Sequence, residues 1–154
     1  MAGNIRTFDP SELSVIVGVY PIPNFLKGDF LEVKRNVTNF DFDVGTEGEM
    51  ARVAQTDKSG TITLKLQHES PANAVLSGLI AADEISAAGI FPINIADLSG
   101  NDVHTALKCF LMGYPEDGKY STSPGRALTY IFICADLDMF FGGTDADSTF
   151  TSLP

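Results

Sequence analysis

Alternation of apolar and polar residues, rather than helical periodicity, dominates the chain and predicts a mainly β protein. The cleanest example runs from Thr61 to Gln67, where Ile62, Leu64 and Leu66 alternate with polar side chains. Strict alternation places one face of a strand in the core and the other in water. Weaker versions of the pattern predict further strands at 13–20, 30–37, 91–95, 103–112 and 128–137, the last with an extension toward 141.

One segment carries helical spacing. Ser70 can accept hydrogen bonds from the free amides of a first helical turn, and Pro71 suits the first helical position. The helix is expected to stop near Ala88, with Gly89 as its C-terminal cap. Its apolar stripe, which should lie on a sheet, consists of Val75, Leu76, Leu79 and Ile80.

An acidic, glycine-punctuated segment from Thr38 to Met50 follows the second strand, and we expect it to be a long loop. A turn at Asp57–Gly60 then leads into the alternating strand. With six or seven strands and one inserted helix, the fold class is mainly β, and a β-sandwich or small barrel is the natural packing. One domain is expected over 1–141, followed by a C-terminal tail at 142–154.

Composition adds constraints on partners. The chain is 44% hydrophobic and 19% charged, as in folded domains, and its net charge is −10. This charge opposes nucleic-acid binding through phosphates but permits DNA to pass without sticking. No apolar signal-peptide core begins the sequence, and the longest apolar run, Tyr130 to Ala135, is too short to insert into a membrane. Cys109 and Cys134 are expected to be free, buried thiols.

No constellation of residues indicates an enzyme. Acid pairs such as Asp41 and Asp43 suit solvated or interface positions better than catalysis, and His68 and His104 lack the spacing of a zinc site. We therefore expect no catalytic residue, no cofactor and no metal. Core packing accounts for most aromatic residues, but a minority in the loop and near the end are candidate anchors for a neighbouring subunit, such as Phe40, Phe42, Phe140 and Phe141.

Three successive segments, at 48–52, 57–66 and 70–76, resemble the tail-tube proteins of long-tailed bacteriophages. In that family a loop bearing Gly and Arg precedes a Lys-Ser/Gly turn, and an alternating strand leads into a Ser-x-x-Asn-x-x-Leu helix. The matching residues here are Gly48, Arg52, Lys58, Ser59, Gly60, Ser70, Asn73 and Leu76. The resemblance is sharpest over 41–80 and extends, as strand order, to most of the chain.

The resemblance implies a tail-tube-like β-sandwich or barrel related to the tubes of contractile tails, pyocins and type VI secretion systems. It implies a virion protein, assembled in the host bacterial cytoplasm, that forms stacked hexameric rings. The implied partners are copies of itself, a tail sheath, baseplate and terminator proteins. Double-stranded DNA would pass through the tube without specific binding.

The resemblance also assigns surfaces. The long loop corresponds to the segment that reaches an adjacent subunit or ring, and Arg52 is expected to pair with a carboxylate in its own chain or across an interface. The residues expected at this contact are Phe40, Asp41, Phe42, Asp43, Glu47, Glu49 and Arg52. The residues expected to face the lumen or the outer wall are Glu32, Lys34, Thr61, Thr63, Lys65 and Gln67.

The sequence leaves two other functional hypotheses open. A tube initiator, terminator or neck protein would share the fold but form one ring instead of a polymer. A monomeric ligand-binding β-barrel or small enzyme would need a concave pocket with convergent polar groups, and the sequence pattern does not indicate one.

Overall fold

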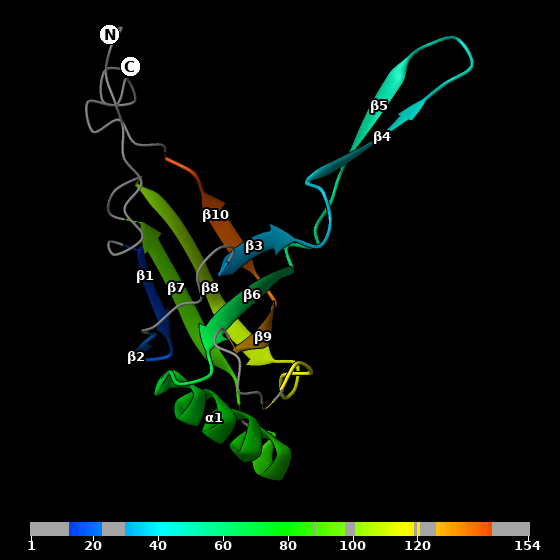
Figure 1. The fold of residues 1–154 in the computed structure, drawn as a ribbon. Coiled ribbons are helices and arrows are strands. Elements are labelled where there is room, and N and C mark those ends of the chain that lie inside the picture. Colours follow the sequence, from blue (N-terminus) through cyan, green and yellow to red (C-terminus); the bar gives the residue numbers. More distant parts are fainter. Residues whose placement is uncertain are drawn as a thin grey trace, which may run out of the picture.

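We analysed the chain as a computed structural model that describes residues 13–22, 30–87, 89–97, 101–118, 120 and 126–142. The described residues form ten strands and one helix (Figure 1). The first strands are β1 (Leu13–Val17), β2 (Tyr20–Pro21), β3 (Leu31–Arg35), β4 (Phe40–Val44), β5 (Met50–Ala54) and β6 (Gly60–Gln67). The rest of the chain forms α1 (Ala72–Ser86), β7 (Phe91–Asp97), β8 (Asp102–Leu111), β9 (Ala127–Cys134) and β10 (Leu137–Phe140).

Eight of these strands form one antiparallel sheet with the order β2-β1-β7-β8-β9-β6-β3, and β10 lies beside β8. The sheet folds over on itself, because Leu31 and Val33 of β3 line the same small cavity as Leu13 of β1 and Ile95 of β7. The mainly β fold with one helix is thus confirmed. Residues 143–154, most of the expected C-terminal tail, lie outside the described residues.

The core lies between the folded halves of the sheet and under α1. Ile62, Leu64 and Leu66 of β6 are all buried, as their alternation predicts, and Leu76 and Ile80 carry the buried stripe of the helix. The two cysteines face each other at paired positions of β8 and β9, with their Sγ atoms 3.1 Å apart. The hydrogen bond with Cys134, together with burial, raises the pKa of Cys109, so this thiol stays protonated at neutral pH.

The last two strands, β9 and β10, are successive partners of the same strand. Both β9 and β10 pair with β8, and the chain bends between them at Ala135 and Asp136. The extension that the pattern predicts toward Phe141 is therefore present, but it is interrupted by this bend.

The predicted end of the helix is wrong. The helix ends at Ser86, and Ala87 takes the left-handed conformation (φ 54°) that we expected of Gly89. Gly89 has a different role: a Cβ at this position would lie 2.7 Å from the Cβ of Asp83, whose carboxylate accepts a hydrogen bond from the Gly89 amide. Glycine is needed there for close packing and not for its φ angle.

The expected long loop at 38–50 is also corrected, because most of it is a β-hairpin. Strands β4 and β5 pair in register from Phe40 opposite Ala54 to Val44 opposite Met50, as a sheet of their own. Figure 1 shows this hairpin, here called the arm (residues 40–54), projecting from the body on the side away from α1. Acidic residues and glycines suggested a loop, but Phe40, Phe42 and Val44 alternate with aspartates as a strand does.

Candidate assembly interface

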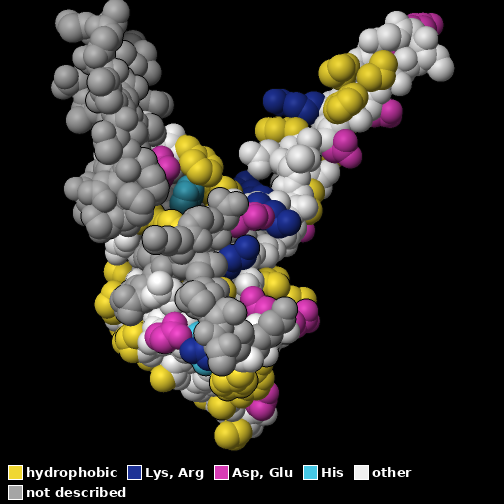
Figure 2. Space-filling model, in the orientation of Figure 1, with side chains coloured by type: hydrophobic (Ala, Val, Ile, Leu, Met, Phe, Trp, Pro, Cys, Tyr) yellow, Lys and Arg dark blue, Asp and Glu magenta, His cyan; other side chains and the backbone are white. Residues whose placement is uncertain are grey.

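The arm has one apolar face that is open to solvent. Cross-strand pairing puts Phe40, Phe42 and Val44 on the same face as Met50 and Arg52. The four large hydrophobic side chains of this face, those of Phe40, Phe42, Val44 and Met50, are between 49% and 69% exposed. Figure 2 shows hydrophobic side chains along the projecting arm. An isolated two-stranded hairpin is marginal in water, so an arm of this kind is suited to being covered by another surface.

The turn at the tip of the arm explains why Gly48 is a glycine. The amide of Gly48 donates to the carbonyl of Gly45 at 3.0 Å, and the amide of Gly45 donates to the carbonyl of Glu49 at 2.8 Å. Gly48 has a φ of +88°, which side-chain-bearing residues rarely adopt. This is a three-residue hairpin loop with glycine at the left-handed position, a signal that identifies a hairpin in the sequence.

Arg52 does not pair with a carboxylate of its own chain within the described residues. Its guanidinium lies over the Phe40 ring, 4.3 Å from the ring centroid. A cation–π contact of this kind holds the guanidinium in one orientation on the apolar face. Of the two partners expected for Arg52, the intramolecular carboxylate is thus excluded among described residues, and an intermolecular one remains a proposal.

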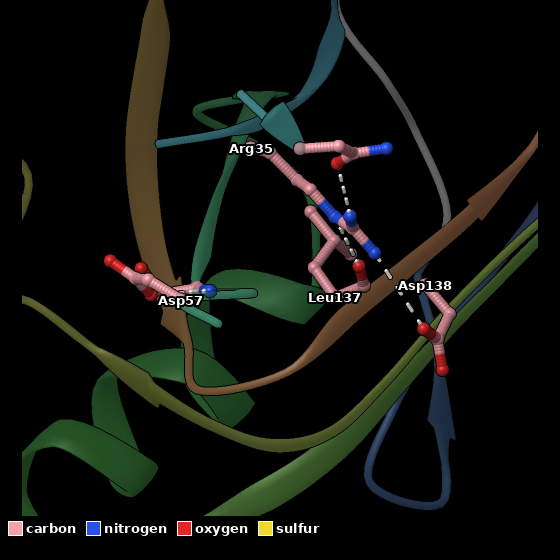
Figure 3. A network of polar contacts seen from close by, with 6 residues as sticks. Arg35, Asp57, Leu137 and Asp138 are labelled. Carbon is pink, nitrogen blue, oxygen red and sulfur yellow. Dashed lines mark hydrogen bonds and ion pairs between the residues drawn. The ribbon is translucent and has the colours of Figure 1, made fainter. Parts of the chain in front are cut away.

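Arg35, which sequence reasoning did not single out, anchors the base of the arm (Figure 3). Its Nε donates to the carbonyl of Leu137 in β10 at 3.0 Å, and its Nη1 donates to Oδ1 of Asn39 at 2.7 Å. Nη2 also lies 3.8 Å from the exposed carboxylate of Asp138. The guanidinium therefore ties the residue that precedes the arm to β10, a strand that is paired with β8 and not with β3 in the sheet.

A second set of bonds fixes the chain on both sides of the arm. The side-chain amide of Asn36 donates to the hydroxyl of Ser59 at 3.1 Å and accepts from the hydroxyl of Thr61 at 2.8 Å. The amide of Ser59 donates to Asp57 at 2.9 Å, and this backbone hydrogen bond lowers the pKa of the Asp57 carboxyl. The predicted turn at Asp57–Gly60 is thus the place where the chain re-enters the body after the arm.

The turn glycine has a packing reason. A Cβ on Gly60 would meet the Lys34 carbonyl oxygen at 2.8 Å and would clash with the side chain of Leu137. The amide of Leu137 in turn donates to the carbonyl of Lys58 at 2.9 Å. The Lys-Ser-Gly turn therefore fits against β10, which explains this part of the motif physically.

The six residues expected on the wet strand face do share one face. Glu32 lies opposite Thr63 and Lys34 opposite Thr61, while Lys65 and Gln67 continue the row along β6. In β9 this row meets two apolar side chains, Ile133 opposite Thr61 and Ile131 opposite Thr63, and then the polar Thr129 opposite Lys65. We call the six-residue set the polar strip.

The Ser-x-x-Asn-x-x-Leu motif joins the helix to the sheet. The Ser70 hydroxyl accepts from the Ala72 amide at 3.3 Å, and the Asn73 side-chain amide donates to the carbonyls of Gln67 and His68, both at 3.0 Å. Oδ1 of Asn73 accepts from the hydroxyl of the buried Tyr130 at 3.0 Å. One asparagine thus satisfies three polar groups where β6 turns into α1.

His104 is the buried titratable group that these contacts leave unsatisfied. It lines a cavity of about 170 Å³ with Asp97 and Asp102, and its ring lies edge-on to Phe141 with 4.7 Å between centroids. Its Nδ1 has no hydrogen-bond partner among the residues that the structure describes. Burial lowers the pKa of His104, although the nearby Asp102 carboxylate opposes this effect.

Among the described residues, no group of three or more His, Cys, Asp or Glu side chains is arranged to hold a metal ion. Within the same part of the chain, no helix has both the length and the apolar character to span a membrane. The described geometry offers a projecting arm, an anchored arm base and sheet faces.

Comparison with known proteins identifies the class. A family described as bacteriophage PhiTE tail tube protein matches residues 27–142 of the sequence. The chain belongs to this phage tail tube family, whose members are structural and not enzymatic. Membership places the protein in the virion tail. No curated protein sequence matched.

Solved structures show the same fold. The sheath/tube terminator of an extracellular contractile injection system, PVC, in its extended state has a TM-score of 0.64 at 15% identity, covering 90% of this chain and 99% of that one. The terminating cap of the anti-feeding prophage tube has a TM-score of 0.63 at 13% identity, covering 92% and 95%. A chain of the PVC sheath–tube complex has a TM-score of 0.62 at 14% identity, covering 88% and 92%.

Proposed function

We propose that this chain is the repeating subunit of a phage tail tube, in which copies form hexameric rings that stack into the conduit for DNA ejection. The observation that carries the proposal is the arm, whose apolar face is exposed along its whole length. In a monomer such a face is a liability, whereas in a polymer it is a contact surface. Family membership supports the same conclusion.

The arm is the proposed inter-subunit element, as expected of its residues. Phe40, Phe42 and Arg52 lie on the apolar face, and Asp41 and Asp43 lie on the opposite face with Val53. The two faces therefore offer different contacts, one apolar and one acidic. Glu47 and Glu49 belong to the tip, the part that extends furthest from the body.

The sheet supplies a second kind of contact. Within the described residues, β2 and β3 are the edges of the large sheet, and an edge strand can pair with a strand of a neighbouring copy. We propose that ring neighbours meet through the sheet and that the polar strip lies on the tube wall, facing the lumen or the outside. A net charge of −10 per subunit disfavours adhesion of DNA to the tube.

The wider assignment follows from the same proposal. The protein would be synthesised and assembled in the host bacterial cytoplasm, with a baseplate at one end of the tube and a terminator at the other. A sheath is an added partner of contractile tails, and one similar structure is a chain of a sheath–tube complex.

A terminator is the second candidate, because two of the similar structures are a sheath/tube terminator and a terminating cap. Their TM-scores match that of the sheath–tube chain to within 0.02, so the fold does not separate the two roles. The test is sedimentation of purified protein over a range of concentrations. A tube subunit gives species that grow with concentration, and a terminator stops at one ring.

An arm-trimmed variant is the matched control, in which residues 40–54 are replaced by a short Asn-Gly turn. Asn39 and Gln55 already form a backbone hydrogen bond of 2.9 Å, so a short turn can close the chain there. The trimmed protein should keep the melting behaviour of the body and lose the large species. Large species that persist without the arm would refute its role in assembly.

A further inference from the structure

A surface groove of about 610 Å³ lies beside β9, between that strand and the β8–β9 connection. Its apolar lining includes Met112, Tyr114 and Ile131, which are 68%, 50% and 37% exposed. Glu116 and Asp117 add two carboxylates to the same lining. Large apolar side chains held open beside acids are typical of a docking surface.

The groove is held in shape by its own contacts. Asp117 accepts a hydrogen bond from the Thr129 amide at 3.0 Å and another from the Thr129 hydroxyl at 2.8 Å. The Met112 amide donates to the carbonyl of Ile131 at 3.0 Å. Because Asp117 is already engaged, the exposed Glu116 is the carboxylate that is available to an incoming cation.

The arm and the groove lie toward opposite ends of the body. The arm follows β3 where Arg35 pairs with Gly60, the first residue of β6. Thr129 in the groove pairs with Lys65, near the other end of β6. Since the arm also points away from α1 in Figure 1, it cannot reach the groove of its own chain. A contact between them must join two copies head to tail, and such contacts either close into a ring or extend into an open polymer.

We propose that the apolar face of the arm of one copy docks in this groove of a second copy, with Arg52 of the arm pairing with Glu116. The inference rests on the proposed function and names the surface that receives the arm. Charge complementarity selects the occupant: the apolar face of the arm carries one charge, the cation Arg52, and the groove carries two carboxylates.

The cation–π contact with Phe40 orients the Arg52 guanidinium before it pairs with Glu116. With its guanidinium held over Phe40, the side chain loses less conformational freedom when it meets a carboxylate. Inside an apolar contact an unpaired guanidinium would be costly to bury, and a carboxylate in the groove removes that cost. Phe42 and Met50 of the same face then supply the apolar area for Met112, Tyr114 and Ile131.

A charge swap tests the pairing in the full-length protein. Arg52→Glu and Glu116→Arg alone should each reduce the pelletable assembled fraction by about tenfold, and the double variant should restore most of it. The matched control combines Arg52→Glu with Glu84→Arg, which restores the same net charge on the exposed face of α1 and should give no rescue. Equal rescue by both pairs, or rescue by neither, overturns the assignment.

Disulfide trapping provides a second measurement that does not depend on the charge variants folding. One protein carries Met50→Cys and a second carries Met112→Cys, and the two are mixed and oxidised with copper phenanthroline. The native thiols Cys109 and Cys134 are buried, so they interfere little. A covalent dimer that forms only in the mixture supports the contact, and its absence from assembled protein refutes it.

The two proposals fail in different ways. If wild-type protein forms neither rings nor tubes, the proposed function is wrong. If tubes form but the charge swap and the trapping both fail, the tube function stands and the arm docks elsewhere.

Discussion

The Nε of Arg35 donates a 3.0 Å hydrogen bond to the backbone carbonyl of Leu137, joining the end of β3 to the start of β10. The two residues are 102 positions apart in the chain, and Asn39, which the same guanidinium binds, leads directly into the arm. The direction of the arm therefore depends on a contact with β10, a strand that is distant in the sequence but adjacent in the fold.

Replacing Arg35 should loosen this connection. Arg35→Ala leaves the Leu137 carbonyl and the Asn39 side chain without this donor, and should destabilise the protein by about 1–3 kcal/mol in urea unfolding. Arg35→Lys should recover only part of the loss, since an ammonium lacks the planar fork that serves two acceptors. The exposed Asp138 contributes little, so Asp138→Asn should be near neutral, and a large effect there would contradict this reading.

Two glycines give a matched pair of substitutions. Gly60→Ala should destabilise the fold by several kcal/mol, because its Cβ would press on the Lys34 carbonyl and on Leu137. Gly78→Ala has open space around it in the middle of α1, and should stabilise the protein by about 1 kcal/mol. Thermal unfolding of both variants measures the difference, and a stable Gly60→Ala protein would show that β10 can move away.

Asn73 should stabilise the packing of α1 against the sheet. Asn73→Ala removes one partner of the Tyr130 hydroxyl and two bonds to backbone carbonyls, with an expected loss of about 2–4 kcal/mol in urea unfolding. A double-mutant cycle with Tyr130→Phe isolates the side-chain bond. Additive effects in this cycle would show that the two side chains do not stabilise each other.

Some of these elements can be predicted from the sequence and others cannot. It predicts β6 and the start of α1 because alternation and an N-terminal Ser-Pro are local signals. It does not predict Arg35 as an anchor, because its partner is a carbonyl of β10 that only the fold brings near. The arm was missed for a different reason: aspartates on its second face outweighed a strand pattern that was present, because no core covers the hairpin.

The buried His104 predicts a pH dependence of stability. Its pKa is lowered in the folded state, so below the ordinary value of about 6.5 the unfolded chain binds more protons than the folded one. Stability should therefore fall as the pH drops below that value, by at most about 1.4 kcal/mol per pH unit. His104→Gln should reduce the difference in unfolding free energy between pH 7 and pH 5.

Two controls define the result. His68→Gln should keep the wild-type difference, because His68 lies outside the cavity. Asp97 and Asp102 face His104 in the cavity, so Asp102→Asn, which removes an opposing charge, should make the acid sensitivity greater. A wild-type difference that persists in His104→Gln would assign the pH dependence to other groups.

The central claim is that this chain polymerises into a tube, and electron microscopy of the purified protein tests it most directly. Negative stain at rising protein concentration should show uniform hollow tubes of constant diameter and increasing length, with six-fold end views. A uniform monomer of 16.5 kDa at the highest concentration would contradict the account.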